Sequence, residues 1–178
     1  MRLFLAIDLP VKIKEKISNM IKNLKQEYQD FRWVSENNYH MTIYFFEENC
    51  SLNNMEEKIK RAIFDIYPFY LYSSQGQLFI RKKVLLYLGF RKNKELEKMA
   101  SNIIKTFSPK KKIKFIPHLT LARYRIPSKQ QYFVIKKKMK DLDIDLEFKV
   151  KKLTLFNCIN YNTKPEYKII KEFELLEK

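Results

Sequence analysis

The sequence predicts an α+β fold in which two pseudo-symmetric lobes bring antiparallel sheets together around a central cleft, with helices outside. The main observation is a duplicated order of elements. Apolar strands beginning at Leu3 and at Val84 are each followed by a helical stretch and then by a strand that carries a histidine, His40 or His118. The two first strands are 81 positions apart and the histidines 78. No Gly-, Ser- or Pro-rich linker interrupts the chain, so we expect one bilobal domain over residues 1–178.

The first half begins with an apolar strand, Leu3 to Ile7, and Pro10 then suits the first turn of a helix. Phe31 to Val34 is a short extended piece that leads to the His40 strand. A second helix follows that strand and ends at Pro68. Apolar residues recur at helical spacing in both helices, which predicts that each covers a core with one face; they are Ile13, Ile17, Met20, Ile21, Leu24 and Tyr28, then Leu52, Met55, Ile59, Ala62, Ile63 and Ile66.

The second half alternates strands and helices in the same way. Ser73 to Gly76 and Arg81 to Lys83 are predicted as turns between three strands. A third amphipathic helix ends near Pro109, and a fourth begins with Ser128 as its cap. The predicted strands are 69–72, 77–80, 84–90, 146–150, 153–160 and 167–175, and the apolar face of the third helix consists of Leu96, Met99, Ala100, Ile103, Ile104 and Phe107.

Composition limits the function classes. Hydrophobic residues make up 46% of the chain and aromatic residues 15%, which is typical of a globular protein. The only glycines, Gly76 and Gly89, cannot form a dinucleotide-binding G-x-G-x-x-G, a Walker P-loop or a G-x-S-x-G elbow. The net charge of +16 favours a polyanionic partner such as RNA, although the excess of Lys over Arg is also typical of a compositionally biased genome.

Two further observations concern the cellular setting. Cys50 and Cys158 are isolated, which is typical of thiols in a reducing cytosol. Asp8 and Pro10 interrupt the first apolar run too early for a signal peptide, and no later stretch reaches the ~18 residues of a membrane span. We therefore expect a soluble, cytoplasmic protein without a membrane contact. We also expect a monomer, although these observations do not bear on the oligomeric state.

The chain's only histidines lie in two similar strands, Tyr39 to Phe45 and Ile116 to Arg123. In a strand, residues i and i+2 point to the same face. Each strand therefore presents one imidazole and one hydroxyl together, from His40 and Thr42 in the first strand and from His118 and Thr120 in the second.

Histidines have three common roles other than acid–base catalysis. An isolated histidine is commonly a structural group, but two histidines in duplicated settings are not. A zinc site needs three or four protein ligands, and the chain has neither an H-E-x-x-H helix nor paired cysteines. A Ser-His-Asp arrangement lacks a nucleophilic elbow. Two imidazoles that titrate near neutral pH can instead divide the work, one accepting a proton and the other donating one.

The pair His40-x-Thr42 and His118-x-Thr120 resembles the twin His-x-Thr signature of the two-histidine phosphoesterases. Within that superfamily the chain is most similar to the RNA 2′,3′-cyclic phosphodiesterases, also called 2′-5′ RNA ligases. The resemblance runs nearly from end to end; it includes Arg2 to Ile7, Trp33-Val34, Gly76 with Phe79, Val84 to Gly89, and Pro117 to Arg123. Cys158 and Lys164 depart from it, since a serine and a glycine are usual there.

The resemblance implies the two-histidine phosphoesterase fold and the hydrolysis of RNA 2′,3′-cyclic phosphate ends to 2′-phosphates without a metal or another cofactor. It also implies reversible 2′-5′ ligation as a side activity. By it, His40 protonates the leaving 3′-oxygen and His118 accepts a proton from water, an assignment that the residues alone leave open. Thr42 and Thr120 would donate hydrogen bonds to the phosphate. Arg123 would contact it as a cation, provided that its strand bulges first, because strict alternation from His118 turns Arg123 to the opposite face.

Two other functions fit the same residues. The catalytic pair could act on 2′-5′ oligoadenylate or on a small cyclic nucleotide. A non-catalytic RNA-binding module would use the histidines only to contact phosphate. A panel of substrates distinguishes the first alternative, and salt-sensitive binding without turnover is expected of the second.

Overall fold

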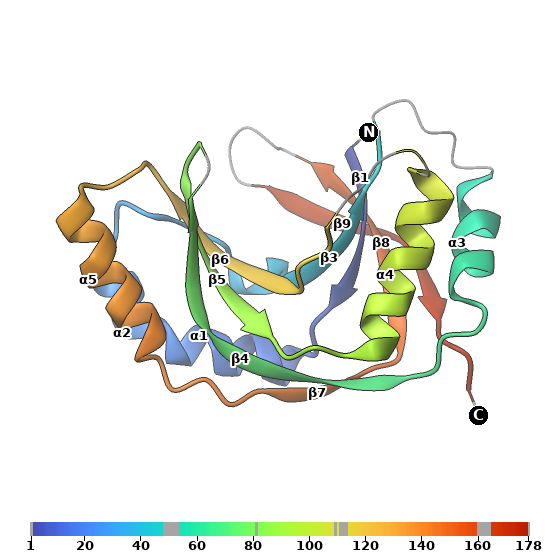
Figure 1. The fold of residues 1–178 in the computed structure, drawn as a ribbon, viewed down its shortest axis with the longest axis horizontal. Coiled ribbons are helices and arrows are strands. Elements are labelled where there is room, and N and C mark those ends of the chain that lie inside the picture. Colours follow the sequence, from blue (N-terminus) through green and yellow to red (C-terminus); the bar gives the residue numbers. More distant parts are fainter. Residues whose placement is uncertain are drawn as a thin grey trace.

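The computed structural model describes residues 2–47, 54–80, 82–108, 110, 114–159 and 165–177, and it contains two antiparallel sheets with helices at both ends (Figure 1). One sheet has the strand order β3-β1-β8-β9 and the other β2-β6-β5-β4-β7. The predicted α+β class is confirmed. The strands are β1 (Arg2–Asp8), β2 (Arg32–Trp33), β3 (His40–Phe45), β4 (Phe69–Ile80), β5 (Val84–Phe90), β6 (His118–Tyr124), β7 (Glu147–Val150), β8 (Lys152–Ile159) and β9 (Glu166–Glu174).

The three helices predicted from apolar periodicity and the one predicted from its Ser128 cap are present, whereas the short 3₁₀ helix η1 (Glu36–Asn38) was not predicted. In Figure 1, α2 and α5 occupy one end of the molecule and α3 and α4 the other. The helix predicted after Pro10 is interrupted at Ile21, so that it forms two shorter helices. The helices are α1 (Val11–Met20), α2 (Lys22–Glu27), the 3₁₀ helix η1 (Glu36–Asn38), α3 (Met55–Ile63), α4 (Lys94–Phe107) and α5 (Lys129–Lys140).

The predicted cap of the fourth helix is confirmed. The Ser128 hydroxyl accepts a hydrogen bond from the Gln131 backbone N–H at 3.2 Å, and the Gln131 side chain accepts one from the Ser128 N–H at 3.3 Å. This reciprocal pair is a capping box, which satisfies two backbone donors that the first turn of a helix leaves free.

The main hydrophobic core joins the two sheets and every described α-helix, and a smaller cluster of Phe4, Ala6 and Phe156 lies apart from it. Leu5 in β1 and Leu86 in β5 are fully buried in the main core, as are Ile17 in α1 and Met99 in α4. Because strand residues alternate, the neighbours of the core-facing residues turn to the other side of each sheet. The histidines lie on that other side.

The prediction of a turn from Ser73 to Gly76 is wrong, because β4 runs through this segment as one strand. The strand changes partner there: its first part pairs with β7 and its second with β5, and the ladder to β5 is irregular between Ser73 and Gly76. Gly76 permits a close approach of α5, since a Cβ there would lie 2.3 Å from the Met139 carbonyl oxygen. The glycine therefore serves packing rather than a turn.

Several residues named in the sequence analysis lie outside the described residues, namely Cys50, Leu52, Arg81, Pro109, Asn160 and Lys164. Cys158 is a free thiol, as expected. None of the helices that the structure describes is both long enough and apolar enough to cross a membrane.

Candidate active site

The first histidine strand, β3, pairs with β1. His40 lies opposite Asp8 and Thr42 opposite Ala6, so the imidazole and the hydroxyl share a face as predicted. The ladder slips after Thr42, because Ile43 is an extra residue in β3. The slip returns Phe45 to the same face, where its ring is 68% exposed.

The second histidine strand, β6, repeats this geometry against β5. His118 lies opposite Gly89 and Thr120 opposite Tyr87, and Leu121 is then the extra residue. Arg123 consequently pairs with Leu85, which is on the same side of β5 as Tyr87. The bulge that the role of Arg123 requires is therefore present, and it places Arg123 on the face of His118 and Thr120.

Both imidazoles are anchored in the same way. Nδ1 of His40 donates a hydrogen bond to the Asn38 carbonyl at 2.7 Å, and Nδ1 of His118 donates one to the Ile116 carbonyl at 2.8 Å. A carbonyl can only accept, so the proton resides on Nδ1 and leaves Nε2 as the reactive nitrogen. In His40, Nε2 lies 3.0 Å from the Thr42 hydroxyl, which donates to it when the imidazole is neutral.

The surroundings of His40 disfavour its charged form. The pKa of His40 is lowered from 6.5 to about 4, chiefly by burial and to a lesser extent by the positive charges of Lys14 and Arg123, while the Asn38 carbonyl and Asp8 act in the opposite direction. Aromatic rings contribute to this burial: Phe4 lies 5.0 Å from the imidazole and Tyr167 meets it edge-on at 5.0 Å. His40 is therefore neutral at pH 7 in the free protein.

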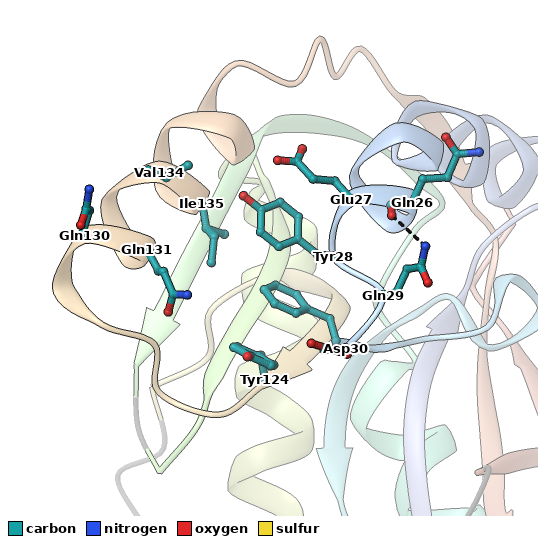
Figure 2. A pocket seen from close by; sticks show the side chains of 11 residues that line it. Gln26, Glu27, Tyr28, Gln29, Asp30, Tyr124, Gln130, Gln131, Val134 and Ile135 are labelled. Atoms are coloured by element: carbon teal, nitrogen blue, oxygen red, sulfur yellow. Dashed lines mark hydrogen bonds between the residues drawn. The ribbon is translucent and has the colours of Figure 1, made fainter.

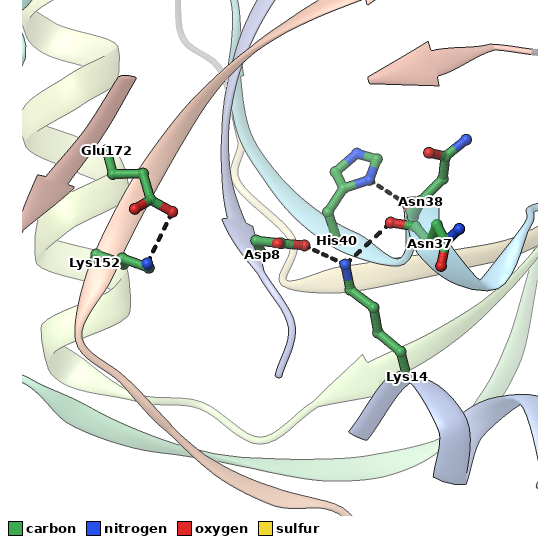
Figure 3. A network of polar contacts seen from close by, with 7 residues as sticks. All are labelled: Asp8, Lys14, Asn37, Asn38, His40, Lys152 and Glu172. Atoms are coloured by element: carbon green, nitrogen blue, oxygen red, sulfur yellow. Dashed lines mark hydrogen bonds and ion pairs between the residues drawn. The ribbon is translucent and has the colours of Figure 1, made fainter. Parts of the chain in front are cut away.

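A polar network supports the loop before His40 (Figure 3). The Lys14 ammonium in α1 forms an ion pair with Asp8 at 2.6 Å and donates a hydrogen bond to the Asn37 carbonyl at 3.0 Å. The Asn38 side chain donates to the Pro165 carbonyl at 2.7 Å. The backbone before His40 is thus held by helix α1, the end of β1 and the residue that precedes β9. This backbone carries the Asn38 carbonyl, which accepts the hydrogen bond from Nδ1 of His40.

The two histidine strands meet although they belong to different sheets. β3 packs against β6, as Figure 1 also shows, and the charge of Arg123 acts on His40. His40, Thr42, His118, Thr120 and Arg123 therefore lie on adjoining strands, each on the face of its sheet that carries the histidine. We call these two surfaces the histidine faces.

Comparison with known proteins establishes the family. The sequence model of the 2′-5′ RNA ligase superfamily matches residues 13–160. The chain belongs to the 2′-5′ RNA ligase superfamily. The resemblance noted in the sequence is thereby confirmed, and with it the prediction of an enzyme.

Two relatives that match this superfamily member over nearly their whole length share one name. An RNA 2′,3′-cyclic phosphodiesterase of Methanocaldococcus jannaschii is 30% identical over 97% of this chain and its own whole length, and one of Thermotoga maritima is 26% identical over 97% of this chain and 94% of the relative. Escherichia coli LigT in complex with 3′-AMP has the same fold, with a TM-score of 0.79 and 22% identity over 99% of this chain and 98% of LigT.

Four residues that sequence reasoning missed belong to the surroundings of this candidate site. Phe45 follows His40 by five positions, just as Arg123 follows His118, so the duplication could have revealed it. Asp8, Lys14 and Asn38 carry no comparable signal, because they come together only in the fold. Among the described residues, no three His, Cys, Asp or Glu side chains gather as a metal site.

A separate pocket of about 440 Å³ lies between α2 and α5 (Figure 2). None of the five predicted site residues lines it. Tyr124, the neighbour of Arg123, does, and its ring stacks on Phe31 at 4.2 Å. The pocket therefore borders the end of β6 on the core side, and it is not part of the histidine faces.

Proposed function

We propose that this chain hydrolyses RNA 2′,3′-cyclic phosphate ends to 2′-phosphomonoesters by acid–base catalysis with His40 and His118, without a metal, and that it carries out reversible 2′-5′ RNA ligation as a side activity. The observation that carries the proposal is the matched anchoring of two imidazoles on adjoining strands, with Nε2 as the reactive atom of each. The names of the full-length relatives support the substrate.

The reaction divides between two sides of phosphorus. One imidazole takes a proton from water as the water oxygen bonds to phosphorus, and the other gives a proton to the 3′-oxygen as its bond to phosphorus breaks. The product is a 2′-phosphate and a free 3′-hydroxyl. Thr42, Thr120 and Arg123 bind the non-bridging oxygens, where negative charge builds up in the transition state.

The resemblance assigns the acid to His40 and the base to His118. Because His40 is neutral in the free protein, its acid role requires that it take up a proton when the anionic phosphate arrives. Protonation of Nε2 also ends its capacity to accept a hydrogen bond from Thr42, which frees that hydroxyl to donate to the phosphate. Binding of the phosphate, charging of His40 and release of Thr42 are thus coupled steps.

An RNA oligonucleotide with a 2′,3′-cyclic phosphate end, incubated in excess EDTA, tests the proposal. We expect conversion to the 2′-phosphate, and a loss of roughly 10²–10⁴-fold in turnover in His40→Ala and in His118→Ala. Turnover within tenfold of wild type in either variant contradicts the mechanism. RNA binding without conversion favours the binding module, and conversion only of 2′-5′ oligoadenylate or a small cyclic nucleotide favours the other substrates.

A further inference from the structure

The two-residue strand β2 places one arginine directly opposite another. Arg32 pairs with Arg123 across β2 and β6. Paired residues of antiparallel strands have Cα atoms about 4.5–5.5 Å apart and point to the same face. Both side chains are exposed, and neither forms an ion pair with a carboxylate of the described residues.

Like charges directly opposite each other destabilise a sheet. Two contacts of the neighbouring residues fix this pairing nevertheless. Phe31 stacks on Tyr124, which is labelled in Figure 2, and the Trp33 indole donates a hydrogen bond to the Tyr28 carbonyl at 2.8 Å. The sheet thus holds two cations together that repel each other in the free protein. An anion bound between or beside the two guanidinium groups offsets their repulsion.

The pairing register shows where the two arginines lie relative to the histidine. Thr120 pairs with Tyr87, and the next pair on the same face is Arg123 with Leu85. Arg32 lies one strand beyond Arg123, at the edge of the sheet. Because Arg32 lies on the edge strand, one strand beyond β6, it is more distant from His118 than Arg123 is.

We propose that Arg32 binds the phosphodiester that joins the cyclic-phosphate nucleotide to its 5′ neighbour, with Arg123 between it and the reacting phosphate. This inference rests on the proposed function and extends it: the preferred substrate is an RNA chain rather than a mononucleotide. The guanidinium group suits this contact, because its planar donors match two phosphate oxygens. The net charge of +16 favours the same polyanionic ligand.

Two substrates with the same reacting end test the role of Arg32. Adenosine 2′,3′-cyclic phosphate has no 5′ phosphodiester, whereas the dinucleotide ApA with a 2′,3′-cyclic phosphate end has one. For Arg32→Gln we expect kcat/KM to fall roughly tenfold or more on the dinucleotide and to stay within about twofold on the mononucleotide. The salt dependence of log kcat/KM on the dinucleotide is expected to be shallower by about 0.7.

Arg61→Gln is the matched control, because Arg61 lies in α3, outside both sheets, and its side chain is 82% exposed. It is expected to leave both substrates unchanged. Arg32→Gln is expected to melt no lower than wild type, since it removes a repulsion, and a lower melting temperature would mean that the arginine pair serves the fold.

Equal losses on both substrates, or no loss on either, overturn the inference while leaving the proposed function intact. If the wild-type protein hydrolyses neither substrate, the proposed function and this inference fail together.

Discussion

At the scale of single residues, the two histidines share one anchoring device but not one environment. Each donates Nδ1–H to a carbonyl two positions earlier. His40 is additionally enclosed by Phe4 and Tyr167 and is affected by the charge of Arg123, whereas Tyr87 approaches His118 edge-on at 5.5 Å. The burial of His40 therefore adds a pH dependence that the repeated motif does not reveal.

Acidification is expected to destabilise the protein through His40. In the unfolded chain this group takes up its proton near pH 6.5, but in the folded protein only near pH 4, so the unfolded state binds more protons between these values and stability falls as the pH falls through this window. The free-energy cost at pH 4 is at most roughly 3 kcal/mol. Urea unfolding of wild type and His40→Gln at pH 7 and pH 4.5 measures it, with His118→Gln as control. An equal loss of stability in wild type and His40→Gln would contradict this expectation.

At the scale of elements, two devices position the site. The bulges at Ile43 and Leu121, each three residues after a histidine, turn Phe45 and Arg123 onto the histidine faces. The second device is the Lys14 network, which joins α1 and the end of β1 to the loop that holds His40. Because the Lys14 side chain is only 11% exposed, its charge depends on these partners.

Replacing Lys14 with Met is expected to lower kcat roughly ten- to hundredfold while KM changes little, because the carbonyl that orients His40 loses its support. Asp8 then faces His40 unpaired, so the pKa of His40 is expected to rise, which NMR titration of the imidazole measures. Lys14→Arg is expected to retain most of the activity.

Lys152→Met is the control for Lys14→Met. This substitution removes the 2.8 Å ion pair between Lys152 and Glu172, which lies in the sheet that contains β3 and is drawn beside the network in Figure 3. Neither residue contacts the loop before His40 in that network. A fall in kcat with an unchanged titration of His40 would show that Lys14 does not act through this histidine.

At the scale of the whole molecule, one core links both halves of the duplication. Residues of both sheets and of every described α-helix belong to it, and the helices at the two ends pack on the same core. We therefore propose that residues 1–178 form a single bilobal domain.

A single domain is expected to unfold in one cooperative transition. Trp33, the only tryptophan of the chain, lies in the five-stranded sheet, so its fluorescence reports on that sheet, whereas far-ultraviolet circular dichroism reports on all elements. The urea midpoints measured by the two signals are expected to coincide. Two separate midpoints would mean that the lobes fold independently.

Local patterns in the chain predicted most elements and the reactive groups. Apolar periodicity indicated the helices, and alternation indicated that His40 shares a face with Thr42, since both depend only on neighbours in sequence. The same local reasoning failed at Ser73 to Gly76, where a strand that changes partners resembles two strands and a turn.

The sequence by itself determined the fold class and the family, and it predicted the pair His40 and His118, because a duplicated motif is written in residue identities and spacing. Tertiary structure decided which side chains join that pair. The register of β6 against β5 turned Arg123 to the histidine face, and the pairing of β2 brought Arg32 beside it. Lys14 met Asp8, and burial lowered the pKa of His40. These outcomes depend on contacts between segments distant in sequence, which local spacing does not encode.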